Sequence, residues 1–152
     1  MTLQPSSEPV RRAPALHEAG GQRDLFTRRV RKPPPASEIA VHCMVADILR
    51  RWGTPGWRWT HLPFGEYRPP ATAARLKRMG VQKGWADFVL LGPGGKVHFL
   101  ELKREGAKLS DDQKEFGWWC MENCVPFEWT DRFDTAVEIL KGWGAVRATI
   151  AA

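Results

Sequence analysis

Two short apolar segments joined by a glycine-rich turn constrain the fold of this chain more than any other feature. They are residues 86–91, read Ala-Asp-Phe-Val-Leu-Leu, and 96–100, read Lys-Val-His-Phe-Leu. The residues between them, Gly-Pro-Gly-Gly, are typical of tight turns and predict a β-hairpin. Because side chains alternate between the two faces of a strand, Glu101 and Lys103 should project from one face, with Asp87 beside Glu101.

Two neighbouring carboxylates and a lysine are the minimum set of side chains for metal-assisted hydrolysis of a phosphodiester. This reaction needs a nucleophilic water, neutralisation of the charge that grows on phosphorus and stabilisation of the leaving oxygen, and Mg²⁺ supplies much of this. We expect Asp87, Glu101 and the main-chain carbonyl of Leu102 to be metal ligands. Lys103 should stay protonated beside them and act through its charge. The alternatives are an ion pair between Asp87 and Lys103 and a solvated strand end without catalytic function.

The composition indicates one folded domain. At 152 residues, with 43% hydrophobic residues and eight tryptophans, the chain can bury a substantial core. No apolar run approaches the roughly 20 residues that span a bilayer, and the N-terminus lacks the apolar segment of a secretory signal. The three cysteines, an odd number, argue against a disulfide framework. We therefore expect a cytoplasmic protein without a membrane partner.

Residues 1–35 differ from the rest of the chain in charge and composition. They hold six of the 12 prolines, and seven arginines and lysines against three acidic residues, so that +4 of the net charge of +6 lies there. We expect a flexible basic arm over 1–35 that speeds association with a polyanion without reading its sequence. An inert leader is the alternative. The expected folded domain spans 36–145, and 146–152 form a C-terminal tail.

The rest of the chain alternates between helical and strand-like segments. Ser37 is a good N-cap for an amphipathic helix, and Ser110-x-x-Gln113 has the form of a capping box that opens another. The expected order is helix 37–52, strand 57–62, short helix 71–79, the two hairpin strands, helix 110–123, strand 126–129 and helix 131–142. A mixed sheet of about four strands flanked by helices is the natural packing of this set, which gives an α/β fold class.

The ordered residues around the hairpin resemble the PD-(D/E)xK nuclease superfamily, whose core motif is an acidic residue, a hairpin and then Glu/Asp-x-Lys. Within that superfamily the chain is most similar to the VRR-NUC family. The similar segments are Lys-Gly-Trp-Ala-Asp at 83–87, Phe-Leu-Glu-Leu-Lys at 99–103 and Gly-Ala-Lys-Leu-Ser at 106–110. The resemblance covers roughly residues 37–142 and departs from the family at Ala86, where proline is usual.

The resemblance implies a restriction-endonuclease-like core and a metal-dependent nuclease. Asp87 and Glu101 would hold a Mg²⁺ or Mn²⁺ ion, and Lys103 would be the catalytic lysine. Gln113 would complete the site, and Glu38 on the first helix would be an auxiliary acid that helps bind a metal or holds Lys103. Both also have simpler explanations, because Gln113 fits the capping box and an acidic residue in the first turn suits the helix dipole. No organic cofactor is implied.

Positive charge that precedes the hairpin suggests contact with nucleic acid. Arg75, Lys77, Arg78 and Lys83 are candidates to follow a phosphate backbone at the mouth of the site, and Gly84 to let that backbone approach closely. An ordinary solvated face is the simpler alternative.

Structural roles are expected for the histidines and for one of two adjacent tryptophans. His42, His61 and His98 lack a spacing typical of metal ligands. Trp118 and Trp119 would point about 100° apart on a helix, so at least one should pack in the core. The other would be free to stack on a base or to fill a dimer interface.

Together these features predict a metal-dependent DNA endonuclease that hydrolyses phosphodiesters by direct attack of a metal-positioned water. A domain this small offers little surface to grip a duplex, so we expect a homodimer that acts on branched, flap or junction DNA in replication, recombination or repair. Stand-alone chains of this family are often encoded by phages and prophages, which suggests work in a host cytoplasm. Two alternatives remain open, a non-catalytic nucleic-acid-binding module with the same fold and an interaction protein that docks a partner through its arm and exposed tryptophans.

Overall fold

The computed structural model describes residues 37–148, so the expected basic arm over 1–35 and the end of the expected tail lie outside the described residues. In chain order the elements are α1 (Glu38–Trp52), β1 (Arg58–His61), α2 (Pro70–Arg78), β2 (Phe88–Leu91), β3 (Val97–Leu102), α3 (Asp111–Glu122), β4 (Phe127–Thr130) and α4 (Phe133–Gly142). These are the helices and strands that the sequence predicts, in the predicted order. None of the described helices is long and apolar enough to cross a membrane.

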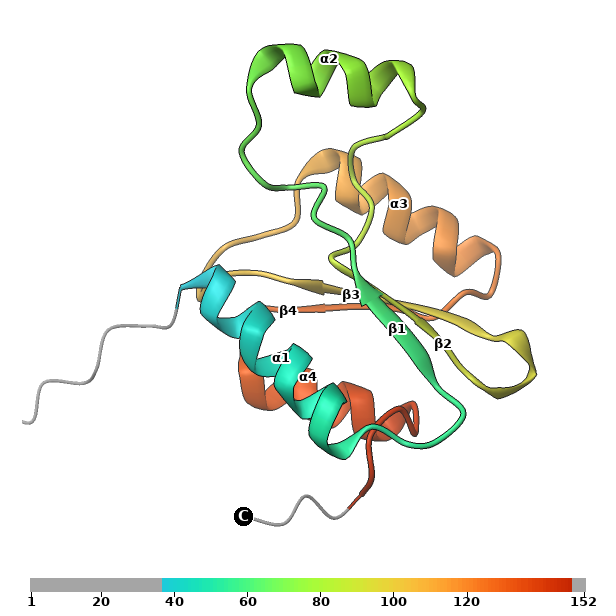
Figure 1. Cartoon of the computed structure of the whole chain (residues 1–152). Coiled ribbons are helices and arrows are strands. Elements are labelled where there is room, and N and C mark those ends of the chain that lie inside the picture. Colours follow the sequence, from blue (N-terminus) through green and yellow to red (C-terminus); the bar gives the residue numbers. More distant parts are fainter. Residues whose placement is uncertain (1–36, 149–152) are drawn as a thin grey trace, which may run out of the picture. The chain divides into compact units, whose positions relative to one another are not determined.

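The four strands form one mixed sheet in the order β1-β2-β3-β4 (Figure 1). β2 is antiparallel to both β1 and β3, whereas β3 and β4 are parallel and are connected through α3. In the hairpin, Phe88 pairs with Leu100. Continuing this register by one residue beyond β2 brings Asp87 opposite Glu101, as the sequence predicts. The predicted mixed sheet of the α/β class is therefore confirmed.

One face of the sheet is covered by α1 and α4, which pack against each other (Figure 1). Phe88 and Leu100 project from this face and are fully buried together with Val45 of α1 and Leu140 of α4. Burying each side chain of this size stabilises the fold by about 1.5–3 kcal/mol. This larger core fixes the hairpin on the helix layer and so positions the residues at its ends.

The opposite face of the sheet is covered by α3 (Figure 1). Ala86, Phe99 and Cys120 form a smaller buried cluster there, and Phe116 packs against it. Side chains alternate along β3, so Glu101 shares this face with Phe99. The acidic side chain is thereby held between the sheet and the start of α3.

The end of the chain contributes to the core further than the sequence suggests. Ala145 and Val146 are buried, and Val146 forms an isolated antiparallel bridge with Gly53 after α1. The packed domain thus includes Val146, one residue past the boundary predicted from the sequence.

Both tryptophans of α3 are exposed, with exposed fractions of 64% for Trp118 and 53% for Trp119. The expectation that at least one of them packs in the core is therefore wrong. The helix approaches the sheet through small residues instead: Cys120 is buried, and a Cβ at Gly117 would lie 3.0 Å from the Phe127 ring. The two indoles flank this close contact and remain accessible.

Candidate active site

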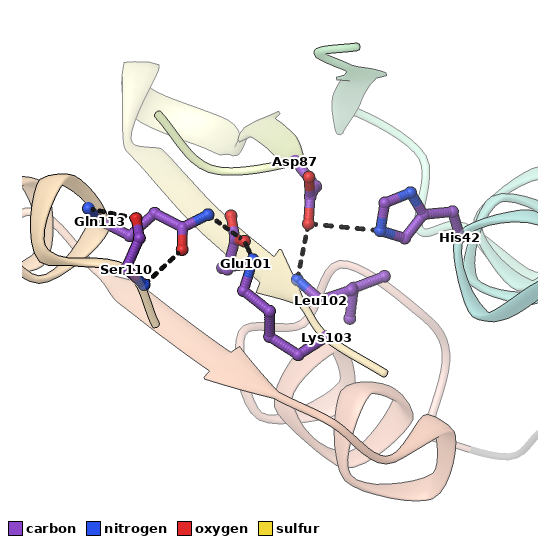
Figure 2. A network of polar contacts seen from close by, with 7 residues as sticks. All are labelled: His42, Asp87, Glu101, Leu102, Lys103, Ser110 and Gln113. Atoms are coloured by element: carbon purple, nitrogen blue, oxygen red, sulfur yellow. Dashed lines mark hydrogen bonds and ion pairs between the residues drawn. The ribbon is translucent and has the colours of Figure 1, made fainter. Parts of the chain in front are cut away.

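A polar network joins the residue before β2 to the end of β3 and to α3 (Figure 2). Asp87 precedes β2, and its Oδ2 accepts a hydrogen bond from the backbone N–H of Leu102 at 2.8 Å. This bond holds the carboxylate across the hairpin, against the strand that carries Glu101. The backbone of Leu102 therefore belongs to the site through its N–H, and the role of its carbonyl as a metal ligand stays a prediction.

Glu101 is fully buried, and its two oxygens have different surroundings. Oε1 lies 2.5 Å from Lys103 Nζ and 2.5 Å from Gln113 Nε2. Oε2 is buried and has no hydrogen-bond partner within the described part of the chain. Burial raises the pKa of Glu101 to about 7, the Asp87 carboxylate adds to the rise, and the Lys103 ammonium opposes it. The carboxylate is costly to ionise until a further cation reaches Oε2.

These surroundings fit a divalent cation. A buried polar atom without a partner costs about 1–3 kcal/mol, and more when it is charged. An ion that prefers oxygen ligands, such as Mg²⁺, would satisfy Oε2 of Glu101 and draw its second carboxylate from Asp87, which the bond to Leu102 already orients. Asp87 and Glu101 are thus the residues whose environments suit a metal, and which metal they hold stays a prediction.

Lys103 immediately follows β3 and reaches the same face as Glu101, as the sequence predicts. Its backbone N–H donates to the carbonyl of Thr130 at 2.9 Å, which holds the lysine backbone on β4. Its ammonium pairs with Glu101 Oε1, whereas Asp87 Oδ2 lies 3.3 Å from His42 Nε2. The ion pair between Asp87 and Lys103 that the sequence left as an alternative is not formed.

Gln113 forms the expected capping box and also contacts Glu101, and its catalytic role stays a prediction. Its side-chain Oε1 accepts from the N–H of Ser110 at 2.9 Å and its backbone N–H donates to Ser110 Oγ at 3.3 Å, which completes the capping box of α3. Its Nε2 donates to Glu101 in the same conformation. The cap therefore orients the amide so that its donor points at the buried carboxylate (Figure 2).

Two substitutions separate these roles of Gln113. Gln113→Glu keeps an acceptor for the capping box but places a second carboxylate beside Glu101, so the pKa of Glu101 should rise further above about 7. Ser110→Ala removes the cap, should cost about 1 kcal/mol of stability, and should leave the titration of Glu101 unchanged. Carbon-detected NMR of the Glu101 carboxyl measures both, and an unchanged titration in Gln113→Glu would contradict the contact.

His42 and His61 lie at the site, although the sequence suggested structural roles. His42 Nε2 is 3.3 Å from Asp87 Oδ2, and the ring centroids of the two histidines are 5.0 Å apart. Burial lowers the pKa of His42, but the carboxylates of Asp87, Glu38 and Glu101 together outweigh it and the net shift is upward. Burial and the neighbouring His42 lower the pKa of His61. The sequence did not predict this placement, because α1 and β1 bring together residues that are distant in the sequence.

Glu38 begins α1 one turn before His42, which places both side chains on the same side of the helix. It is half-buried, its side chain makes no hydrogen bond or ion pair with another described residue, and its charge helps to raise the pKa of His42. The helix dipole alone accounts for an acidic residue at this position. Its role as an auxiliary acid stays a prediction.

A groove of about 1260 Å³ runs between the segment around α2 and the face of α3. Three of its aromatic residues form a stack, in which the Phe116 ring lies 4.9 Å from Trp85 and 6.4 Å from Trp119. Asp112 and Glu115 add negative charge on the α3 side. Two residues of the groove, Trp85 and Asp112, are close in sequence to Asp87 and Gln113 of the polar network. The groove therefore adjoins the network.

The basic residues that precede the hairpin divide between this groove and the open surface of α2. Lys77 and Lys83 line the groove. Arg75 and Arg78 are exposed on α2 and do not line it. Their contact with nucleic acid stays a prediction.

Gly84 has a packing role that accounts for its glycine. Its backbone has a φ of +83°, and a Cβ there would lie 2.5 Å from the carbonyl oxygen of Asp112. The segment that leads into Asp87 therefore contacts the first turn of α3 directly, next to Gln113. A contact of Gly84 with nucleic acid stays a prediction.

Gly84→Ala should destabilise the domain by about 2–5 kcal/mol, because a left-handed backbone and a steric clash both oppose the methyl group. Gly80→Ala is the matched control, since Gly80 has a φ of +93° and nothing within 4 Å of its Cβ position. It should cost only about 1–2 kcal/mol. Urea unfolding of both variants measures the difference, and equal losses would contradict the packing role.

Solved VRR_NUC domain structures share this architecture. A structure described as a VRR_NUC domain protein aligns with a TM-score of 0.60 at 21% sequence identity, over 76% of this chain and 100% of that chain. A second, described as a VRR_NUC domain, aligns with a TM-score of 0.51 at 15% identity, over 71% of this chain and 99% of that chain. No protein-family model and no curated protein matches the chain. The chain therefore has the VRR_NUC fold, and the resemblance found in the sequence is confirmed at the level of the fold.

Proposed function

We propose that this protein is a metal-dependent DNA endonuclease of the VRR-NUC family. The observation that carries the proposal is Glu101, a fully buried carboxylate with one unpartnered oxygen, opposite Asp87 and in contact with Lys103. Such a group lowers the stability of the fold, and strongly perturbed carboxyls cluster at functional sites. The VRR_NUC fold supports the same assignment.

The described side chains suit the steps of phosphodiester hydrolysis. A Mg²⁺ or Mn²⁺ ion held by Asp87, Glu101 and the Leu102 carbonyl would supply Lewis-acid chemistry to the phosphate and to the attacking water. Lys103 adds a fixed positive charge at the same carboxylate and stabilises the negative charge that develops on the phosphate oxygens. Gln113 holds Oε1 of Glu101, which keeps Oε2 for the cation.

DNA is proposed to lie across α2 and along the groove beside α3. Basic side chains on α2 would contact phosphates, and the stack of Trp85, Phe116 and Trp119 would accept unpaired bases. A groove that accepts unpaired bases favours branched, flap or junction DNA over plain duplex. No segment resembles a base-reading element, so cleavage should depend on DNA structure. A strong preference for one cut sequence in random duplexes would overturn this part.

A triple variant removes the three basic residues of α2 by the substitutions Arg75→Ala, Lys77→Ala and Arg78→Ala. It should bind DNA more weakly than the wild type. The plot of log affinity against log salt concentration has a negative slope, and the magnitude of this slope should decrease by about 1 for each phosphate contact that is lost. Arg50→Ala with Arg51→Ala, at the end of α1, is the control and should leave the slope unchanged. Fluorescence anisotropy at several salt concentrations measures both slopes. Equal slopes in all proteins would place the DNA elsewhere.

We also propose a homodimer, because one domain of this size offers little surface to grip a branched substrate. Family resemblance supports a phage or prophage origin and a role in DNA replication, recombination or repair in a host cytoplasm.

Cleavage of labelled duplex, single-stranded, flap and four-way-junction DNA tests the proposed function. Each substrate is incubated with Mg²⁺, with Mn²⁺ and with EDTA, using the full chain beside Lys103→Met. We expect cleavage that needs a divalent metal, prefers a branched substrate and is lost in the variant. Binding without cleavage under any metal would overturn the proposal in favour of a non-catalytic nucleic-acid-binding module.

A further inference from the structure

We propose that His42, His61 and Asp87 form a second cation site, which binds a first-row transition-metal ion such as Zn²⁺ or Co²⁺ in preference to Mg²⁺. The side chains come from α1, from the end of β1 and from the residue before β2, and all three are half-buried. One ligand atom of each lies within 4.8 Å of the others. This inference goes beyond the proposed function, because metal can bind here whether or not the protein cleaves DNA.

The contact between His42 and Asp87 leaves the His42 imidazole incompletely satisfied. His42 Nε2 is buried and has no hydrogen-bond partner in the described part of the chain. It lies 3.3 Å from Asp87 Oδ2, which already accepts the Leu102 N–H (Figure 2). A buried polar atom without a partner is costly, and an imidazole nitrogen is also a metal ligand. A cation between the two groups would give the imidazole nitrogen a partner and bind the Asp87 carboxylate.

Phe88 holds both imidazole rings in place before any ion binds. The His42 ring meets Phe88 edge-on with centroids 6.0 Å apart, and the His61 ring lies 5.2 Å from the same residue. The two imidazoles are tilted by 56° to each other at 5.0 Å. Phe88 itself is fully buried, so it is a rigid support. Ligands fixed in this way lose little freedom on binding, which favours affinity.

The ligand chemistry determines which ion the site prefers. Imidazole suits zinc, copper, iron and nickel, whereas carboxylates, carbonyls and water suit magnesium, calcium and manganese. Glu101, which lies opposite Asp87 in the hairpin, offers a cation a carboxylate oxygen without a partner, Oε2. Asp87 would therefore serve two positions of different preference, a nitrogen-containing one with the histidines and an oxygen-only one with Glu101.

Co²⁺ titration followed by visible absorption and calorimetry tests the site, using full-length chain without a histidine tag. Cys43 and Cys124 are exposed thiols and are replaced by serine throughout, so that they do not bind the ion. We expect one Co²⁺ per chain with an absorption spectrum typical of nitrogen ligands. His42→Gln and His61→Gln should each weaken binding by at least about 10-fold. Glu101→Gln should leave Co²⁺ binding unchanged, which separates this site from the proposed catalytic one.

The other two histidines provide the matched control. His17→Gln and His98→Gln should both retain the affinity for Co²⁺, and circular dichroism checks the fold of every variant. His98 packs against Trp57 and Trp143, so His17→Gln and Glu101→Gln are the remaining controls if His98→Gln does not fold. Absence of Co²⁺ binding would overturn the proposal. So would equal affinity in the His42 and His61 variants, or loss of binding in Glu101→Gln alone.

Discussion

Lys103→Met is expected to lower the rate of metal-dependent DNA cleavage by about 10²–10³-fold, the loss typical of removing one fixed group that stabilises transition-state charge. Methionine has a similar length and no charge, so it keeps the volume of this side chain, which is only 14% exposed, and removes its charge. The loss should appear in single-turnover cleavage of the preferred substrate at saturating Mg²⁺. DNA binding in the absence of metal should change much less, because the lysine acts on the reacting phosphate.

Lys141→Met is the control for the loss of one positive charge. Lys141 pairs with Glu138 within α4 at 3.0 Å and makes no contact with the polar network. Its substitution should leave cleavage close to the wild-type rate. If Lys103→Met retained most of the activity, Lys103 would be a structural partner of the buried Glu101, and the catalytic charge would have to come from another residue.

The local parts of the site could be predicted from the sequence because short-range rules determine them. Strand alternation places Glu101 and Lys103 on one face, and the turn register brings Asp87 opposite Glu101. The capping box predicts where Gln113 lies at the start of α3. In each case the residues that meet are joined by one hairpin or one helical turn, so their spacing carries the information.

The histidine pair could not be predicted, because its members lie on different elements. His42 is on α1 and His61 ends β1, and only the packing of both elements against Phe88 brings the rings together. No spacing rule relates a helix to a strand across a core. A polar residue on the buried side of α1 was the available signal. The exposure of Trp119 was missed for a similar reason, since it depends on how closely α3 approaches the sheet.

Glu101→Gln is expected to stabilise the metal-free protein at neutral and alkaline pH by about 3 kcal/mol, because the wild type must hold a buried carboxylate there. Glutamine has the same shape and can still face Lys103 and Gln113. Removal of a catalytic carboxylate would then increase stability while it abolishes cleavage. Such a trade of stability for function is expected at an active site.

The direction of the pH dependence follows from the raised pKa. The folded-state pKa of Glu101 is about 7 against an ordinary value of 4.5, so the unfolded chain releases this proton first as pH rises. Below 4.5 both states hold the proton, and the wild type should match the glutamine variant. Between the two values the wild type should lose about 1.4 kcal/mol per pH unit relative to the variant.

Urea unfolding of both proteins in EDTA, at several pH values from acid to alkaline, measures this difference. Glu128→Gln, at an exposed position on the neighbouring β4, is the control and should not reproduce it. Parallel pH profiles for wild type and Glu101→Gln would show that the carboxylate is ionised without cost.

Adding Mg²⁺ should close the stability difference between the two proteins at high pH, since an ion at 100 times its Kd stabilises the protein that binds it by about 2.7 kcal/mol. Equal stabilisation of both proteins would place the ion away from Glu101. If Mg²⁺ stabilises the wild type and leaves Glu101→Gln unchanged, the buried oxygen of Glu101 that destabilises the metal-free protein is the metal ligand.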